Sequence, residues 1–444
     1  MAISKYVVVA LLSVLGAWIY PPVKSFLNVM GVRPFESREN IHGSETLFIP
    51  DTIGCEDLEY HAPSGMLYTA CVGDIEIARG WNPGAQALER HDRPAFGHIV
   101  VIDPKTMKSQ KLSFDNFDGP FATHGIGLYT PPADQDIVYI YAINHLPNPR
   151  WTPGSTSEEK AASQVELFIH TVGSTTARHI RSIAHPLLRT PNDILGISEH
   201  EFLVTNDHYY RDGRMRSVEM LLRGFVCWTD LVHVRFDEKD VDAAVVLDTV
   251  ANNNGLGWGP DHQVIIGNAA GGHVLFASVP GTEEGNTSKS NNNNNNNNDN
   301  GTRTAMKVSH SVPMDAIVDN AAFFADPFAG SHGKDYSGYL MPGMSDGHNF
   351  VPSFKDPDFA APMPGRVMYL PAIAGRDRDV RANRRRRRLI FRDDGSTLRG
   401  ATTSALVAID PALNGGKREG WLFVTSIIDS KVIATRIDFE TALG

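Results

Sequence analysis

Short runs of hydrophobic residues, many alternating with polar ones, make up most of the chain after about residue 45. The runs are rich in β-branched and aromatic side chains, and Gly, Asn, Asp and Pro separate them, a pattern typical of β-strands. The clearest runs cover residues 66–71, 98–102, 137–143, 166–169, 201–205, 231–236, 263–267, 274–277, 421–425 and 431–437. Long helical periodicity is nearly absent beyond the N-terminal segment, so the sequence predicts an all-β fold.

Pairs of these runs recur about every forty to fifty residues, which is the spacing of β-propeller blades around a central channel. We therefore predict that residues 45–444 form a single six-bladed β-propeller. Two segments are expected to be insertions in it. Residues 281–304 contain a run of Asn from Asn291 to Asn298 and are predicted to be a disordered loop. Residues 328–365 are rich in Gly, Pro, Asp and Ser and are predicted to be a loop insertion.

The N-terminal segment reads as a secretory leader. Residues 6–20 carry no charge, follow Lys5 and precede two prolines. This run is shorter than the roughly 20 residues that span a bilayer comfortably. Residues 1–22 are therefore predicted to be either a cleaved signal peptide or an uncleaved signal anchor, with Trp18 and Tyr20 at the membrane interface. Either outcome predicts a secreted or membrane-anchored glycoprotein, and sequons at Asn286 and Asn300 agree.

Composition and charge exclude several other classes of protein. With 41 Lys and Arg against 51 Asp and Glu, the formal net charge is −10, which argues against nucleic-acid binding. The basic run from Arg384 to Arg388 is interpreted as a solvated loop tip. Three Cys are too few for a disulfide scaffold. Neither a P-loop nor an H-E-x-x-H motif is present.

Groups of acids and amides stand beside many of the predicted strands, at intervals that match the blades. They are Glu56-Asp57, Asn192-Asp193, Asn206-Asp207, the Asn run 252–254 and Asp319-Asn320. Carboxylate and amide oxygens are the ligands that Ca²⁺ takes, in six- to eightfold coordination. Propeller strands start near the central channel, so residues from different blades can converge there. Because successive strand residues point to opposite sides, we expect neighbouring residues in a pair to serve different ions.

Several of these residues lie in motifs that resemble the paraoxonase/arylesterase family. Residues 54–59, Gly-Cys-Glu-Asp-Leu-Glu, are similar to its G-S-E-D-L-E opening, and residues 123–126, Thr-His-Gly-Ile, to its P-H-G-I segment. Residues 143–145, Ile-Asn-His, look like its V-N-H, and residues 205–210, Thr-Asn-Asp-His-Tyr-Tyr, like its T-N-D-H-Y-F. Further matches, at residues 191–194, 254–256, 318–320 and 394–400, follow in family order.

The resemblance implies a six-bladed propeller with two calcium ions in its central tunnel. The catalytic calcium would be held by Glu56, Asn192, Asn254, Asp319 and Asn320. The structural calcium would be held by Asp57, Asp193 and the backbone carbonyl of Ile126. His124 and His145 match the family's His–His dyad, while Asp207 and His208 are placed near the tunnel by their motif.

The function that this resemblance implies is calcium-dependent hydrolysis of lactones and/or aryl esters. Calcium would polarise the carbonyl, and water activated by the His dyad would attack it. One alternative is a gluconolactonase-like propeller with a single metal. The adjacent acid and amide pairs at 56–57 and 192–193 argue against it, because they favour two metal ions. Another is a non-catalytic, calcium-stabilised binding propeller, similar to strictosidine synthase.

The chain departs from the family at its cysteines and between about residues 321 and 390. Animal members join an early Cys to one near the C-terminus, but this chain ends without a Cys. Either strand pairing alone closes the ring, or Cys55 pairs with Cys71. The segment between about residues 321 and 390 is longer than the corresponding segment of the family and does not align with it.

Overall fold

The computed structural model describes residues 39–93, 95–155, 158–222, 228–279, 305–314, 316–331, 333–356, 363–372 and 385–444, and parts of residues 13–31. Cys227, the sequons at Asn286 and Asn300, the Asn run and Arg384 lie outside the described residues, as does most of the segment 1–22. No helix within the described part of the chain is long and apolar enough to cross a membrane.

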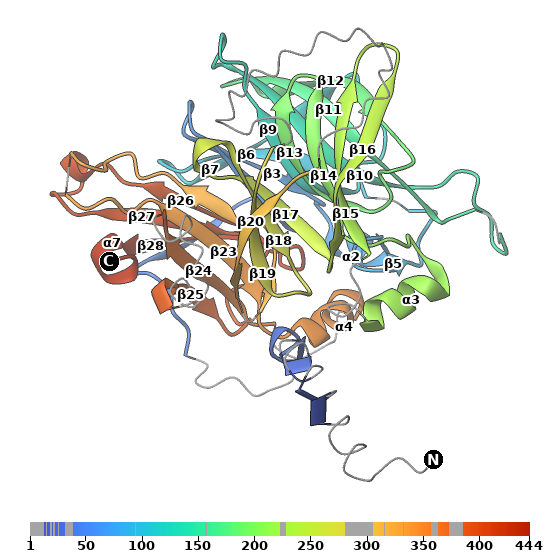
Figure 1. Cartoon of the computed structure of the whole chain (residues 1–444). Coiled ribbons are helices and arrows are strands. Elements are labelled where there is room, and N and C mark those ends of the chain that lie inside the picture. Colours follow the sequence, from blue (N-terminus) through green and yellow to red (C-terminus); the bar gives the residue numbers. More distant parts are fainter. Residues whose placement is uncertain are drawn as a thin grey trace, which may run out of the picture.

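The described strands form six sheets of four or five strands, arranged as the blades of a propeller (Figure 1). The first blade is β2 (Cys55–His61), β3 (Met66–Cys71), β6 (His98–Asp103) and β7 (Lys108–Lys111). The second is β9 (Thr123–Tyr129), β10 (Ile137–Pro147), β11 (Ala161–Thr171) and β12 (Thr176–Ile183), with β8 (Ser113–Asp115) at its edge. The third is β13 (Pro191–Ser198), β14 (Glu201–Asn206), β15 (Thr229–Phe236) and β16 (Val241–Val250).

The remaining blades follow the same order along the chain. The fourth is β17 (Asn253–Trp258), β18 (Gln263–Asn268), β19 (His273–Ser278) and β20 (Val308–Pro313). In the fifth, β21 (Ile317–Val318) and β22 (Ala322–Phe324) both pair with β23 (Gly338–Met344), followed by β24 (Gly365–Pro371) and β25 (Arg388–Asp393). The sixth is β26 (Ser404–Ala408), β27 (Glu419–Val424), β28 (Val432–Asp438) and β1 (Thr46–Ile49). The predicted all-β, six-bladed propeller is confirmed.

Several short strands, helices and turns lie outside the sheets of the blades. They are the strand pair β4 (Trp81–Asn82) and β5 (Ala87–Leu88), the helices α2 (Ile75–Gly80), α3 (Gly213–Leu222), α4 (Phe350–Lys355) and α7 (Phe439–Ala442), and the 3₁₀ turns η1 (Pro260–His262), η2 (Gly347–Asn349) and η3 (Pro411–Leu413). Helices α2, α3 and α4 gather on the side of the propeller from which the N-terminal segment extends (Figure 1).

Six of the hydrophobic clusters lie between adjacent blades. Each cluster combines side chains from two neighbouring sheets; Phe202 and Val232 of the third blade, for example, pack with Tyr141 and Val165 of the second. The other five clusters join the remaining neighbours around the ring. Alternating side chains along each strand supply one face of the sheet to each neighbour.

The ring closes by strand pairing between the two ends of the propeller. β1 pairs antiparallel with β28, placing Thr46 opposite Thr435 and Ile49 opposite Val432. A disulfide between Cys55 and Cys71 is also present, but it joins β2 to β3 within the first blade. Both alternatives that the sequence left open are therefore present. Strand pairing closes the ring, and the disulfide lies within one blade.

Residues 328–365 are not the loop insertion that their composition predicts. They contain β23, which forms the centre of the fifth blade, and the helix α4. Gly343 is needed inside this strand, because a Cβ there would stand 2.0 Å from the carbonyl oxygen of Ile317. The glycine that looks like a turn signal in the sequence instead allows two backbones to approach closely.

The innermost strands of the first five blades each contain one residue more than the strand beside them. Between matched pairs, β2 advances two residues (Cys55 to Asp57) while β3 advances one (Cys71 to Ala70). The corresponding extra residues fall in the intervals 123–126, 191–194, 253–256 and 318–322. Such β-bulges break the strict two-residue alternation of side chains, and all five lie where the sequence places candidate site residues.

Replacing Ile49 in β1 should weaken the closure of the ring. Ile49 is 1% exposed and packs between the sixth and first blades, whereas its neighbour Phe48 is 56% exposed. We expect Ile49→Ala to lower the free energy of unfolding by about 2–5 kcal/mol, and Phe48→Ala to lower it by less than about 1 kcal/mol. Urea unfolding of both variants at one calcium concentration measures the difference. Equal losses would show that burial of β1 does not hold the ring closed.

Candidate functional site

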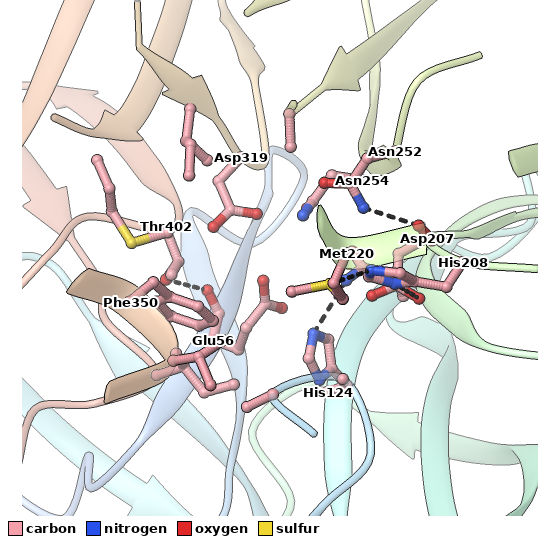
Figure 2. A pocket seen from close by; sticks show the side chains of 18 residues that line it. Glu56, His124, Asp207, His208, Met220, Asn252, Asn254, Asp319, Phe350 and Thr402 are labelled. Carbon is pink, nitrogen blue, oxygen red and sulfur yellow. Dashed lines mark hydrogen bonds and ion pairs between the residues drawn. The ribbon is translucent and has the colours of Figure 1, made fainter. Parts of the chain in front are cut away.

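Seven of the predicted site residues line a cavity of ≈ 70 Å³ in the central channel (Figure 2), whereas His145, Asn320, Asp57, Asp193 and Ile126 do not. Its lining includes, among the predicted residues, Glu56, His124, Asn192, Asp207, His208, Asn254 and Asp319. Figure 2 shows Glu56, Asn254 and Asp319 reaching from different blades toward a common space, with His124 at its edge. A cavity of this size has room for an ion and a few water molecules.

The bulges place both members of a neighbouring pair along the channel. Glu56 lines the cavity, whereas Asp57 lines a second, larger cavity of ≈ 430 Å³ in the same channel. The two neighbouring side chains therefore face different cavities. The extra residue of β2 falls at this position, and Asn192 of β13 lines the first cavity together with Glu56.

Five buried oxygen atoms on the predicted ligands have no hydrogen-bond partner among the described residues. They are Oε2 of Glu56 and the Oδ1 atoms of Asn192, Asn254, Asp319 and Asn320, which is the complete ligand set predicted for the catalytic calcium. Asn320 is held against this group, because its Nδ2 donates to Oε1 of Glu56 at 2.9 Å. Buried polar atoms are almost always paired in native proteins, so this donor set fits a bound cation.

Electrostatics supports the same assignment. Burial raises the pKa of Glu56 and of Asp319 well above their ordinary values, and their mutual proximity and that of Asp57 raise the pKa of Glu56 further. Two carboxylates and three amide carbonyls are hard oxygen ligands of the kind that Ca²⁺ prefers. Among the described residues, no group of three or more His, Cys, Asp and Glu side chains is arranged to hold a metal.

The residues predicted for the structural calcium lie together, with their carboxylates already hydrogen-bonded. Asp57 accepts bonds from the backbone N–H of Ile126 at 3.0 Å and from the hydroxyl of Thr403 at 3.0 Å. Asp193 accepts one from the N–H of Leu256 at 2.6 Å. Burial and the charge of Asp57 raise the pKa of Asp193 well above its ordinary value. Two neighbouring carboxylates fit a cation here too. Their oxygens already accept hydrogen bonds, unlike the five unpartnered oxygens predicted to bind the catalytic calcium.

The two predicted histidines lie edge to face, with ring centroids 5.3 Å apart and planes at 82°. Nδ2 of Asn192 lies 3.2 Å from Nε2 of His124, which accepts its hydrogen bond when the amide oxygen faces the cavity. Nδ1 of His145 lies 2.8 Å from the hydroxyl of Ser163, and Trp81 donates to the His145 carbonyl. Burial lowers the pKa of His124 to about 4 and that of His145 to about 3, so both rings are neutral near pH 7.

Asp207 and His208 lie in the same site, paired through Oδ1 and Nδ1 at 3.0 Å. Burial alone would raise the pKa of Asp207, but His208 and Arg216 outweigh it and hold that pKa well below its usual range. Arg216 comes from α3 and is buried, with a hydrogen bond to the carbonyl of Gly84 at 3.3 Å. The sequence did not single out this arginine, because nothing in its local pattern distinguishes it from a surface cation.

Residues 343–347 read Gly-Met-Ser-Asp-Gly, the G-x-S-x-G spacing of serine hydrolases, and the sequence reasoning missed them. Ser345 lies between β23 and η2 and is buried. It does not line the cavity, and no described histidine forms a hydrogen bond with its hydroxyl. The geometry therefore gives Ser345 no nucleophilic role.

Comparisons with known proteins find one family. The family model described as Arylesterase matches residues 83–270. The chain is 29% identical over 216 residues to serum paraoxonase/arylesterase 2 of Gallus gallus, covering 48% of this chain and 52% of the relative. It is 24% identical over 356 residues to serum paraoxonase/lactonase 3 of Oryctolagus cuniculus, covering 80% of each chain. The chain is therefore similar to members of the paraoxonase/arylesterase family.

The first of these matches spans about half the length of the paraoxonase it aligns with. Among solved structures, the chain is similar to an aldose sugar dehydrogenase from Streptomyces coelicolor, with 12% identity and a TM-score of 0.40 over 90% of this chain and 100% of that one. It is also similar to the gluconolactonase XC5397 from Xanthomonas campestris, with 10% identity and a TM-score of 0.40 over 91% and 98% of the two chains.

Without a bound cation, the stability of this protein should depend on pH in an unusual way. A folded-state pKa that is raised, as for Glu56, Asp193 and Asp319, contributes stability below the unfolded-state pKa and loses it as pH rises through the folded pKa. We therefore expect the melting temperature of the calcium-free protein to fall between about pH 5 and 8. Excess calcium should remove the fall, because the cation stabilises the ionised carboxylates.

The comparison variant is Glu56→Gln, which removes one of the charges while keeping the shape. Its calcium-free melting temperature should fall less with pH than that of the unmodified protein. If the melting temperatures of the two calcium-free proteins change equally with pH, Glu56 does not contribute to repulsion among the buried carboxylates.

Proposed function

We propose that this protein is a calcium-dependent hydrolase of lactones and/or aryl esters. The observation that carries the proposal is the set of five unpartnered, buried oxygen atoms beside neutral His124. The names of the curated relatives, paraoxonase, arylesterase and lactonase, support this class of substrate.

The residues have distinct roles in the proposed reaction. Glu56, Asn192, Asn254, Asp319 and Asn320 hold the catalytic calcium, and Asp57, Asp193 and the carbonyl of Ile126 hold a structural one. When bound, calcium supplies positive charge beside the substrate carbonyl oxygen. His124 takes a proton from the attacking water, and the edge of His145 fixes the orientation of the His124 ring. Asp207 and His208 complete the polar wall opposite Glu56.

The surroundings of the cavity suit a small substrate with an apolar part. Ile317, Met344, Phe350, Val351 and Ile427 line the side of the cavity formed by α4 and the neighbouring loops. These side chains exclude water from the carbonyl being attacked, which strengthens electrostatic interactions there. The same region packs against Val29 and Met30 of the N-terminal segment.

Hydrolysis of phenyl acetate and of a panel of lactones, with and without a chelator, tests the proposal. We expect hydrolysis that chelation abolishes and calcium restores, with two calcium ions bound per chain. One bound ion would favour the gluconolactonase-like alternative. Calcium binding without hydrolysis of any of these substrates would favour the non-catalytic propeller. In the same assay, Asp319→Ala should reduce kcat/KM at saturating calcium at least about tenfold more than His124→Ala does.

The physical reason is that Asp319 both places the ion and sets its charge, an effect worth several kcal/mol. A general base contributes about 10²–10⁴-fold, and neighbouring groups can partly replace it. Asp248→Ala, which removes an exposed acid on β16, is the matched control and should leave kcat/KM unchanged. Activity of Asp319→Ala close to that of the unmodified protein would refute the calcium-site assignment.

We also propose that residues 6–20 bring the protein into the secretory pathway and hold it on a membrane or lipid surface if they are not removed. Sequencing of the mature N-terminus distinguishes a signal peptide from an anchor. An intact leader should make the protein float with lipid vesicles, and deletion of residues 1–22 should abolish flotation. A mature chain that begins beyond Pro22 and does not float would show that the leader is a cleaved signal.

A further inference from the structure

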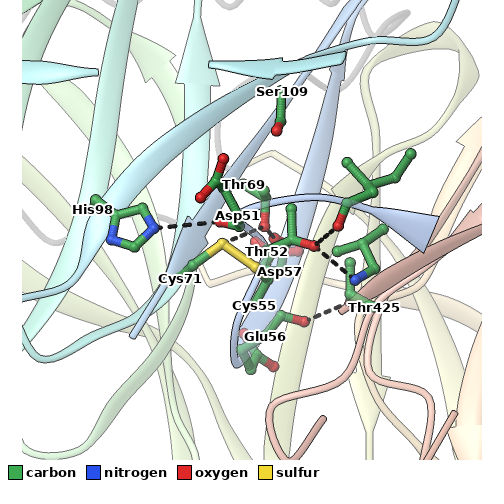
Figure 3. The surroundings of a disulfide bond; sticks show 12 residues. Asp51, Thr52, Cys55, Glu56, Asp57, Thr69, Cys71, His98, Ser109 and Thr425 are labelled. Carbon is green, nitrogen blue, oxygen red and sulfur yellow. Dashed lines mark hydrogen bonds between the residues drawn. A yellow bond between two sulfur atoms is a disulfide. The ribbon is translucent and has the colours of Figure 1, made fainter. Parts of the chain in front are cut away.

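The disulfide of this protein lies beside the candidate metal ligands, away from the point where the ring closes. It joins Cys55 of β2 to Cys71 of β3, and Glu56 and Asp57 follow Cys55 directly (Figure 3). The two cysteines are 1% and 0% exposed. Because β1 and β28 already close the ring, the disulfide is not required to join the first blade to the last. Its position indicates a local role.

The bulge that carries Glu56 has a competing arrangement. Cys55 stands opposite Cys71 and Asp57 opposite Ala70, so Glu56 is the residue without a partner on β3. A slip of β2 by one residue would take the extra residue into the ladder. It would also turn the side chains beyond it to the opposite face of the sheet. Such a slip requires Cys55 to move away from Cys71, which the covalent bond prevents.

Hydrogen bonds hold the bulge from the side of the sixth blade. The backbone carbonyl of Glu56 accepts bonds from the hydroxyls of Thr402 at 2.5 Å, Thr403 at 2.9 Å and Thr425 at 3.0 Å. The hydroxyl of Thr403 also donates to Oδ1 of Asp57 at 3.0 Å. These contacts exist only in the bulged register, so the disulfide and the threonines stabilise the same backbone from opposite sides.

We propose that the Cys55–Cys71 disulfide positions Glu56 and Asp57 for calcium binding, a role that rests on the proposed function. Both candidate calcium sites draw one carboxylate from this bulge. A free β2 would spend time in the slipped register, in which that carboxylate is withdrawn, and the calcium affinity would fall accordingly. Loss of a contact that orients a metal ligand typically weakens metal binding about 10- to 100-fold, and we expect a loss of that size here.

Isothermal titration with calcium tests the proposal in a Cys227→Ser parent, which retains only the two paired cysteines. The test variant adds Cys55→Ala and Cys71→Ala. The matched control adds Val100→Ala, which removes a buried side chain from the same hydrophobic cluster without touching the bulge. We expect the calcium Kd to rise about 10- to 100-fold in the test variant and to stay close to that of the parent in the control.

Melting temperatures with and without calcium separate positioning from general stabilisation. A disulfide that only stabilises the fold would lower both melting temperatures equally and leave the increase produced by calcium intact. A positioning disulfide would make that increase smaller, because the increase depends on calcium affinity. If the test variant does not fold, reduction of the folded parent with a phosphine, followed by reoxidation, gives the same comparison: affinity should fall and then return.

Two results would overturn the inference and identify which step failed. If the parent binds calcium and the disulfide-free protein binds it equally well, the positioning role is excluded and the proposed function stands. A parent that binds no calcium would overturn the proposed function, and the inference with it.

Discussion

The candidate site depends on one extra residue in each of several innermost strands. A regular strand directs successive side chains to opposite faces, so a regular β2 could not aim both Glu56 and Asp57 into the channel. The bulge makes this possible but removes backbone groups from the ladder. Threonine hydroxyls replace the lost partners: three of them bind the carbonyl of Glu56, and Thr205 donates to the carbonyl of Asn254 at 2.6 Å.

The same construction gathers buried carboxylates that repel one another. Burial of Glu56, Asp193 and Asp319 is unfavourable unless a cation compensates their charges. The six clusters between blades hold these side chains in place, since each innermost strand is fixed by packing on both faces of its sheet. The propeller therefore places stability in its periphery and accepts unfavourable electrostatics at its axis, a division common at functional sites.

Much of this architecture can be predicted from the sequence. Strand periodicity locates two strands in each of five blades, such as β3 and β6 in the first, but none in the fifth. Motif order locates Glu56, Asn192 and Asp319. Bulges are harder to predict from the sequence, because one additional residue barely changes a short hydrophobic pattern. The strand β23 replaces the predicted loop, since Gly343 serves close backbone approach to β21. Arg216 and the threonines around Glu56 act through contacts between residues far apart in sequence, which periodicity does not report.

The pairing of β1 with β28 also sets a time scale for folding. The two strands are separated by nearly the whole chain, with Thr46 opposite Thr435. During synthesis at about 5–20 residues per second, β1 would wait about 20 to 80 seconds for its partner. Throughout that interval its hydrogen-bonding edge is unpaired, and an unpaired edge is a template for wrong pairings. The last blade is therefore the step at which a nascent chain is most exposed to misassembly.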